Sequence, residues 1–187
     1  MQFAKNFLIR YLSPQRLTVF VCLCGISFAQ SSGVWLDVPF VPQEKNGCGA
    51  AVIAMVVQYW QHQLPQQDAV ADAGQIQRAL YSSSAHGIYA SDVERYLQEH
   101  GFRTFVVKGD WDLLRQHLEK GRPVIVALKP SKGEPSLHYV VVAGLDWSSN
   151  LLLVNDPAQK KLLKVERRPF EKEWSAVGRW TLLAVPN

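Results

Sequence analysis

Cys48 is the residue of this sequence best placed for nucleophilic chemistry. It stands between Gly47 and Gly49, directly before a long apolar run. A thiol attacks as its thiolate, and a helix N-terminus favours that anion because its unpaired N–H groups carry partial positive charge. The two glycines would leave the backbone open to a substrate carbonyl, so that the Cys48 N–H could donate to the developing oxyanion. The alternative is a free cysteine that acts only as a small buried hydrophobe.

Two further residues could complete a catalytic group with Cys48. His138 begins the apolar segment 138–144, and Asp156 closes the next such segment, eighteen residues later. Because turn-forming residues lie between the segments, we expect a hairpin that brings the two side chains together. His138 would then act as base and Asp156 would orient its ring. The alternative is a strand histidine with a satisfied ring and an aspartate that only starts a turn.

Asn155 is the neighbour against which the role of Asp156 can be judged. Strand alternation should send the Asn155 side chain to the opposite face, so we expect it to matter little to catalysis.

A second oxyanion donor could come from the loop before the cysteine. The amide of Gln43, five residues before Cys48, offers two N–H donors, and Asn46 is the competing donor. Either amide could instead be a solvated loop residue.

The first thirty residues have the layout of a secretory signal peptide. Residues 1–16 contain three basic residues and no acidic one, and an apolar run at 17–28 follows. Small side chains at 27 and 29 suit signal cleavage, so we expect segment 1–29 to be removed and 30–187 to form the mature domain. A spanning helix needs about 20 apolar residues, and this run has only 12. We therefore expect a periplasmic or extracellular protein without a stable membrane anchor.

Composition limits the partners and the metals that this protein could use. Without segment 1–29, 17 basic and 16 acidic residues remain, a formal charge of +1. Such a balance does not favour nucleic acid as a partner, and the basic residues between 160 and 168 read as a solvated strand face and turn. Cys22 and Cys24 lie in the signal, so Cys48 is the one thiol of the mature chain. One cysteine and scattered histidines do not make a zinc site.

The order of elements predicts an α+β domain. Segment 34–40 should be extended, and the apolar run from 48 to 60 should form a helix buried at the centre of the domain. Further helices are expected within 66–81, from a capping box at Ser91 and Glu94 to about 100, and over 111–120 behind Asp110 as cap. The remaining apolar segments should form one sheet. They are 102–107, 123–128, 138–143, 151–154, 161–165 and 179–185.

Four short segments match the motifs of a known family. They are 38–43 (Val-Pro-Phe-Val-Pro-Gln), 47–51 (Gly-Cys-Gly-Ala-Ala), 138–142 (His-Tyr-Val-Val-Val) and 155–157 (Asn-Asp-Pro). They resemble the bacteriocin-processing peptidases, a papain-like family that also supplies the leader-cleaving domains of peptide exporters. Segment 87–97 resembles that family's loop and helix, so the resemblance spans nearly all of 34–187.

The resemblance implies a role for each candidate residue. Cys48 would be the nucleophile, His138 the general base, Asp156 its orienter and Gln43 an oxyanion donor. The implied fold is papain-like, with a central N-terminal helix that carries the cysteine and packs on a C-terminal antiparallel sheet. Peptides or proteins would be the substrates, no cofactor is implied, and we expect a monomer.

Two departures limit what the resemblance implies about the substrate. The separation of Gln43 and Cys48 is one residue shorter than expected for leader-cleaving members. The sequence also holds no phosphate-binding Gly-rich loop with a Lys-Ser or Lys-Thr ending. We therefore expect a stand-alone exported thiol peptidase rather than a cytoplasmic leader peptidase. The alternatives are a related acyl transferase or amidase, which would use the same three residues, and a catalytically silent peptide-binding module.

Overall fold

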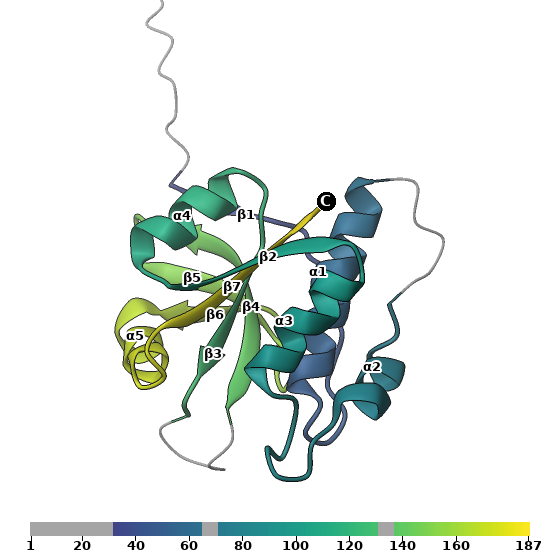
Figure 1. The fold of residues 1–187 in the computed structure, drawn as a ribbon. Coiled ribbons are helices and arrows are strands. Elements are labelled where there is room, and N and C mark those ends of the chain that lie inside the picture. The colour runs from purple at the N-terminus through teal and green to yellow at the C-terminus, as the bar shows by residue number, and fades with distance from the viewer. Residues whose placement is uncertain (1–31, 65–70, 131–136) are drawn as a thin grey trace, which may run out of the picture. The chain divides into compact units, whose positions relative to one another are not determined.

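Helix α1 (Cys48–Gln63) runs through the middle of the domain, and every residue from Cys48 to Val57 is buried. The computed structural model describes residues 32–64, 71–130 and 137–187. A helix that is apolar on nearly every side can be stable only where packed elements surround it. Figure 1 shows α1 alongside the sheet and next to two further helices. The sequence-based expectation of a central buried helix is therefore confirmed, and segment 1–29 lies outside the described residues.

The described residues form a seven-stranded antiparallel sheet in the order β2-β7-β3-β4-β5-β6. The short strand β1 pairs with the end of β4, beyond the residues of β4 that pair with β3. Strand β4 is thus central, and its first residue, His138, lies opposite Leu128. The strands are β1 (Gly33–Trp35), β2 (Phe102–Lys108), β3 (Val124–Leu128), β4 (His138–Asp146), β5 (Leu151–Asp156), β6 (Lys160–Glu166) and β7 (Trp180–Pro186).

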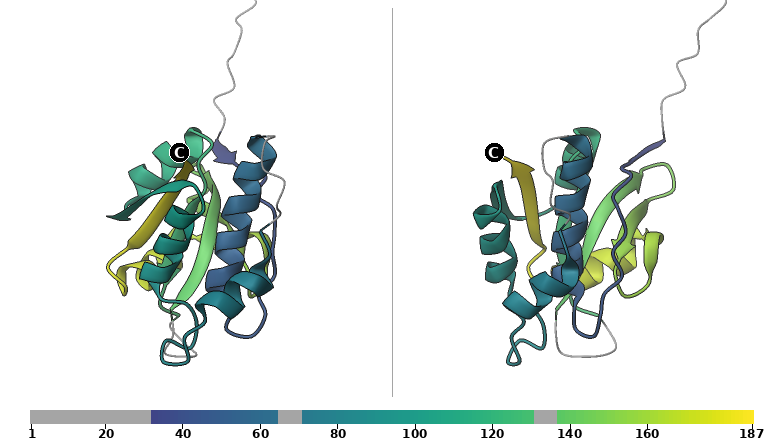
Figure 2. Two further views of the ribbon diagram at one scale, coloured as in Figure 1. Left: turned by 45° about the vertical axis from the view of Figure 1, so that its right-hand side comes forward. Right: turned by 90° about the vertical axis from the view of Figure 1, so that its right-hand side faces the viewer.

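Helices cover both faces of this sheet. Helices α2 (Ala73–Leu80) and α3 (Ala90–Glu99) join α1 on one face, whereas α4 (Trp111–Glu119) and α5 (Arg167–Ser175) pack on the other (Figure 1). Figure 2 shows α1 and α3 alongside the twisted strands. The fold class is therefore α+β, as expected.

Alternation along β4 divides the interior into two cores. Tyr139 and Val141 pack into the core around α1, and Val140 and Val142 pack into the core under α4 and α5. Successive side chains of a strand point to opposite faces, so a single strand can serve both cores. The same alternation places His138 on the face of Val140, at the end of the strand.

Two local expectations were wrong. Tyr89 is the N-cap of α3 and makes no capping bond through its side chain, so Ser91 and Glu94 do not form a capping box. Glu94 instead accepts a hydrogen bond from Thr104 Oγ1 at 3.1 Å. The basic residues between 160 and 168 are divided between an edge strand and a helix that was not predicted. Arg167 is the first residue of α5, where it pairs with Glu171.

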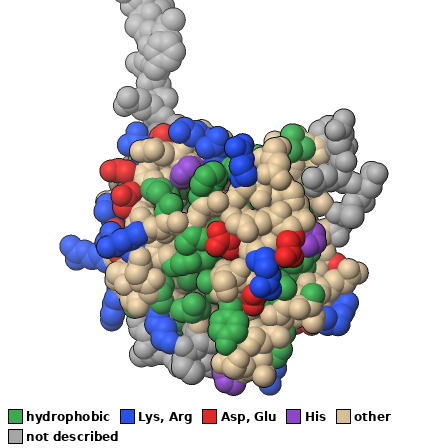
Figure 3. Space-filling view, viewed as in Figure 1, with side chains coloured by type: hydrophobic (Ala, Val, Ile, Leu, Met, Phe, Trp, Pro, Cys, Tyr) green, Lys and Arg blue, Asp and Glu red, His purple; other side chains and the backbone are tan. Residues whose placement is uncertain are grey.

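The surface carries charges of both signs. Acidic, basic and hydrophobic side chains are interspersed over the face in Figure 3. On the edge strand β6, Lys161 pairs with Asp37. Within the described ranges, none of the helices combines the length and the apolar character that crossing a bilayer demands.

Candidate active site

Cys48 begins α1 and is 9% exposed. Gly47 is the N-cap residue, so the thiol sits where a loop turns into the helix. The Cys48 Sγ atom lies 3.9 Å from the backbone oxygen of Leu137, the residue before β4. The start of α1 and the start of β4 are therefore next to each other.

His138 faces both of the other candidate residues. Its Nε2 atom lies 2.8 Å from Asp156 Oδ1, and its ring also hydrogen-bonds to Cys48. Because Asp156 occupies Nε2, the nitrogen left for the thiol is Nδ1. The register of β4 and β5, in which Val141 lies opposite Asn155, brings the start of one strand to the end of the other. The predicted hairpin thus brings His138 and Asp156 together, and the start of α1 supplies Cys48.

The electrostatics of the pair favour a charged imidazolium. Burial opposes protonation of His138, but hydrogen bonds and charges from Asp156 and Cys48 prevail and raise its pKa to about 9. Burial alone would likewise raise the pKa of Asp156. The hydrogen bond and positive charge of His138, with two donors from the following turn, lower it instead. At neutral pH the pair is therefore an aspartate and an imidazolium.

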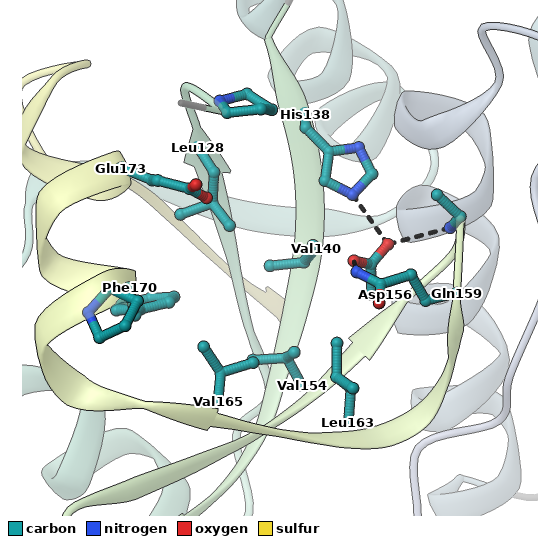
Figure 4. A pocket seen from close by; sticks show the side chains of 13 residues that line it. Leu128, His138, Val140, Val154, Asp156, Gln159, Leu163, Val165, Phe170 and Glu173 are labelled. Atoms are coloured by element: carbon teal, nitrogen blue, oxygen red, sulfur yellow. Dashed lines mark hydrogen bonds and ion pairs between the residues drawn. The ribbon is translucent and has the colours of Figure 1, made fainter. Parts of the chain in front are cut away.

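The turn after β5 holds the Asp156 carboxylate (Figure 4). The backbone N–H of Ala158 donates to Oδ1 at 2.9 Å, and the amide of Gln159 donates to Oδ2 at 2.5 Å. The turn is closed by a bond of 2.9 Å from the Gln159 N–H to the Asp156 carbonyl. Both carboxylate oxygens are therefore fixed. Sequence reasoning missed Gln159, although a polar residue three positions after a turn aspartate was a usable signal.

Asn155 has a structural role, and its expected unimportance for catalysis stays a prediction. It is fully buried, and its amide donates to the carbonyl of Val38 at 3.1 Å. Its Oδ1 accepts from the N–H of Leu162 at 2.9 Å. Although the side chain does point away from His138, it ties the extended segment that precedes the loop before Cys48 to strands β5 and β6.

Gln43 lies on that loop, and its backbone N–H donates to the carbonyl of Pro157 at 3.0 Å. Its side-chain Oε1 is buried and has no hydrogen-bond partner among the described residues. Asn46, the competing donor, adopts a positive φ of 57° in the turn just before the helix. The turn after β5 thus anchors the Gln43 loop as well as Asp156.

The two glycines around Cys48 also have a packing role, and the open approach expected for the substrate stays a prediction. A Cβ on Gly49 would lie 2.9 Å from Ile88 Cβ, and one on Gly47 would collide with the Gln77 amide. That amide is itself held by a 2.8 Å bond to the Lys45 carbonyl. Close approach of neighbouring segments therefore requires glycine at both positions.

Two pockets flank the site. A pocket of about 480 Å³, here called the His138 pocket, is lined by His138 and Asp156 and by side chains of β4, β5, β6 and α5 (Figure 4). A smaller one of about 200 Å³, the Cys48 pocket, is lined by Cys48, Leu137, Tyr139 and residues 85–90 except His86. Across the part of the chain that the structure describes, no three metal-ligating side chains gather in one place.

Comparison with known proteins identifies the family. The model of the Peptidase_C39 like family matches residues 35–181. The peptidase domain of Streptococcus ComA, a bifunctional ABC transporter of a quorum-sensing pathway, is 25% identical with a TM-score of 0.61, over 79% of this chain and 97% of that one. No protein with a curated description matches the sequence.

Two more distant structures share the fold. A double-glycine motif protease of an AMS/PCAT transporter, solved with its leader peptide, is 21% identical with a TM-score of 0.59, over 82% of this chain and 95% of that one. Xylellain, a cysteine protease from Xylella fastidiosa, is 11% identical with a TM-score of 0.63, over 83% and 86%. The chain therefore belongs to the Peptidase C39-like family and is a cysteine peptidase with a papain-like α+β fold.

Proposed function

We propose that Cys48, His138 and Asp156 hydrolyse peptide bonds as a triad, through a thioester acyl-enzyme. The observation that carries the proposal is the position of the His138 ring, which hydrogen-bonds to Asp156 through Nε2 and also to Cys48. This is the nucleophile, base and orienter arrangement of thiol hydrolases. A silent binding module would have no need of a buried aspartate and an imidazolium beside a thiol.

The first half of the reaction transfers the acyl group to the enzyme. The Cys48 thiolate attacks the substrate carbonyl carbon, so that a C–S bond forms and the carbonyl oxygen becomes an oxyanion. The Gln43 amide and the Cys48 N–H donate to that oxyanion. The His138 imidazolium then gives its proton to the leaving nitrogen as the C–N bond breaks. The products are a thioester on Cys48 and a free amine.

The second half releases the acid. Neutral His138 takes a proton from water as the water oxygen attacks the thioester carbon, and the C–S bond breaks to restore the thiolate. Asp156 keeps the ring oriented and stabilises each imidazolium. An amine in place of water would give acyl transfer from the same thioester, so the products of a reaction run with added amines distinguish the two outcomes.

Replacement of the nucleophile is the direct test. Cys48→Ala and Cys48→Ser should reduce cleavage of a mixed peptide library to background, while the circular dichroism spectrum stays that of the wild type. A thiol-directed activity probe should label the wild type and neither variant. Turnover by pure Cys48→Ala equal to that of the wild type would overturn the proposal.

We place this activity outside the cytoplasm, since segment 1–29 has the signal layout described above. Mass spectrometry of the protein from its native host should give a mature N-terminus at Gln30. A protein that keeps Met1 and stays with the cytoplasmic fraction would contradict this placement.

A further inference from the structure

The two pockets beside the catalytic residues lie on opposite faces of strand β4. His138 and Val140 line the His138 pocket, whereas Leu137 and Tyr139 line the Cys48 pocket. Strand alternation enforces this separation, because neighbouring residues point to opposite faces. Cys48 is absent from the lining of the larger pocket, and His138 is absent from that of the smaller one.

The proposed chemistry assigns one side of the peptide to each pocket. The carbonyl carbon bonds to Cys48, and the leaving nitrogen receives its proton from His138. The leaving segment of the substrate, whose N-terminus is the new amine, therefore departs past the imidazole. The His138 pocket adjoins this path, because His138 and its partner Asp156 both line it.

We propose that the His138 pocket binds a large apolar side chain from the leaving segment of the peptide, and so selects the residues on the C-terminal side of the cleaved bond. The proposal rests on the function proposed above and adds its substrate preference. The His138 pocket would then recognise the substrate in addition to the catalytic residues.

The walls of the pocket support this choice of ligand. Val140, Val154, Leu163 and Val165 point toward its interior (Figure 4), and Phe170 adds an aromatic wall. Its volume of about 480 Å³ falls within the roughly 300–1,000 Å³ of pockets that bind small ligands. An aliphatic or aromatic side chain would exchange water for apolar contacts there.

The charge at the edge of the pocket should exclude acidic side chains of the substrate. Glu173 on α5 and Asp156 on the facing side both line it. Glu173 brings a negative charge to the pocket, whereas the charge of Asp156 is balanced by the His138 imidazolium beside it. A substrate carboxylate would meet the like charge of Glu173 as it lost water, and such a contact discriminates against a ligand. We therefore expect acidic residues of the leaving segment to be rejected.

A peptide-library digest of the purified protein tests the inference, with mass spectrometry reading the residues on both sides of each cut. For the wild type, large aliphatic or aromatic residues should be enriched on the C-terminal side, and Asp and Glu should be depleted. Val165→Phe narrows the pocket and should shift the preference toward smaller side chains. The change should be about 10-fold or more for each methylene that no longer fits.

Two further variants make the test specific. Glu173→Gln should raise cleavage of peptides with acidic leaving segments relative to cleavage of peptides with neutral ones. Lys164→Ala is the matched control, since Lys164 is exposed on the same strand β6 and does not line the pocket. Val165→Phe and Lys164→Ala both alter the edge strand β6. Chemical unfolding curves equal to that of the wild type would show that both variants fold.

The outcomes separate this inference from the proposed function. Cleavage without any preference on the C-terminal side, or a preference that Val165→Phe leaves unchanged, would overturn the pocket's role while the triad stands. If the wild type cleaves no peptide and takes up no thiol probe, the proposed function fails, and the pocket's role with it.

Discussion

The charge of His138 depends most directly on the carboxylate of Asp156. Asp156→Asn keeps an oxygen that can accept from Nε2 but removes the negative charge that helps to raise the His138 pKa. We expect kcat/KM to fall by roughly 10²–10⁴-fold, less than on loss of Cys48, with Asp156→Ala more harmful. The alkaline limb of the pH–rate profile should also move below about 9.

Stopped assays from pH 5 to 10 would measure both effects. The limb moves because an imidazole without its carboxylate neighbour loses its proton at lower pH, and the imidazolium that protonates the leaving amine is then lost earlier. An Asp156→Asn enzyme with an unchanged alkaline limb would show that Asp156 does not control the charge of His138.

Gln159 acts through Asp156, which makes it a positioning residue. Gln159→Ala removes the donor to Oδ2, so the pKa of Asp156 should rise toward its ordinary value. We expect about a tenfold loss of kcat/KM, the worth of one hydrogen bond to a charged group. The acidic limb of the profile should move to higher pH, a change that loss of stability alone would not cause. Gln159→Asn, with a shorter amide, should restore part of the rate.

Among the structural elements, strand β5 fastens the extended segment around Val38 to the sheet through Asn155. Asn155→Ala would remove the partner of the buried Val38 carbonyl and of the part-buried Leu162 N–H. We expect the free energy of unfolding to fall by about 1–3 kcal/mol for each such group. Urea unfolding of Asn155→Ala beside Gln159→Ala would measure the difference, because the second change removes a bond on the side chain of Asp156 and should cost less. Equal stability of Asn155→Ala and the wild type would contradict this role.

The elements themselves were largely predictable, since their patterns are local. The unbroken apolar run after Cys48 indicated a buried helix, and the valines after His138 indicated a core strand; the structure has both. Helix α5 was missed because Pro169 and a dense run of charges hid Phe170 and Trp174, its two buried residues. The role of Asn155 could not be predicted, because its partners at 38 and 39 lie more than a hundred residues away.

At the scale of the whole molecule, the three candidate residues lie where two packed layers meet. Cys48 belongs to the core around α1, and the pocket beside His138 opens from the core under α5. Motif spacing placed the three residues on the right elements, but the His138 pocket arises from side chains of β4, β5, β6 and α5 together. Such a surface depends on sheet order and strand register, which no single segment of sequence specifies. The catalytic roles of Cys48, His138, Asp156 and Gln43 stay predictions until the variants are measured.

The stability of the folded protein should depend on pH through His138 and Asp156. The His138 pKa is raised from 6.5 to about 9, so folding takes up a proton between these values. The resulting stabilisation is complete below pH 6.5 and disappears as the pH rises through about 9. The lowered pKa of Asp156 acts in the opposite sense, since its contribution is present above the ordinary value of 3.8 and disappears as the pH falls through the folded value. The pair should therefore stabilise the fold most between about pH 4 and 6.5.

Urea unfolding of the wild type and of His138→Gln across pH 5 to 10 measures this contribution. Relative to the variant, the free energy of unfolding of the wild type should fall by up to about 1.4 kcal/mol per pH unit between 6.5 and 9. Above pH 9 the two curves should run parallel, because His138 is then neutral in both the folded and the unfolded chain. A difference between the two proteins that stays constant from pH 6 to 9 would mean that His138 does not change its charge on folding, and the imidazolium proposed for the resting enzyme would have to be abandoned.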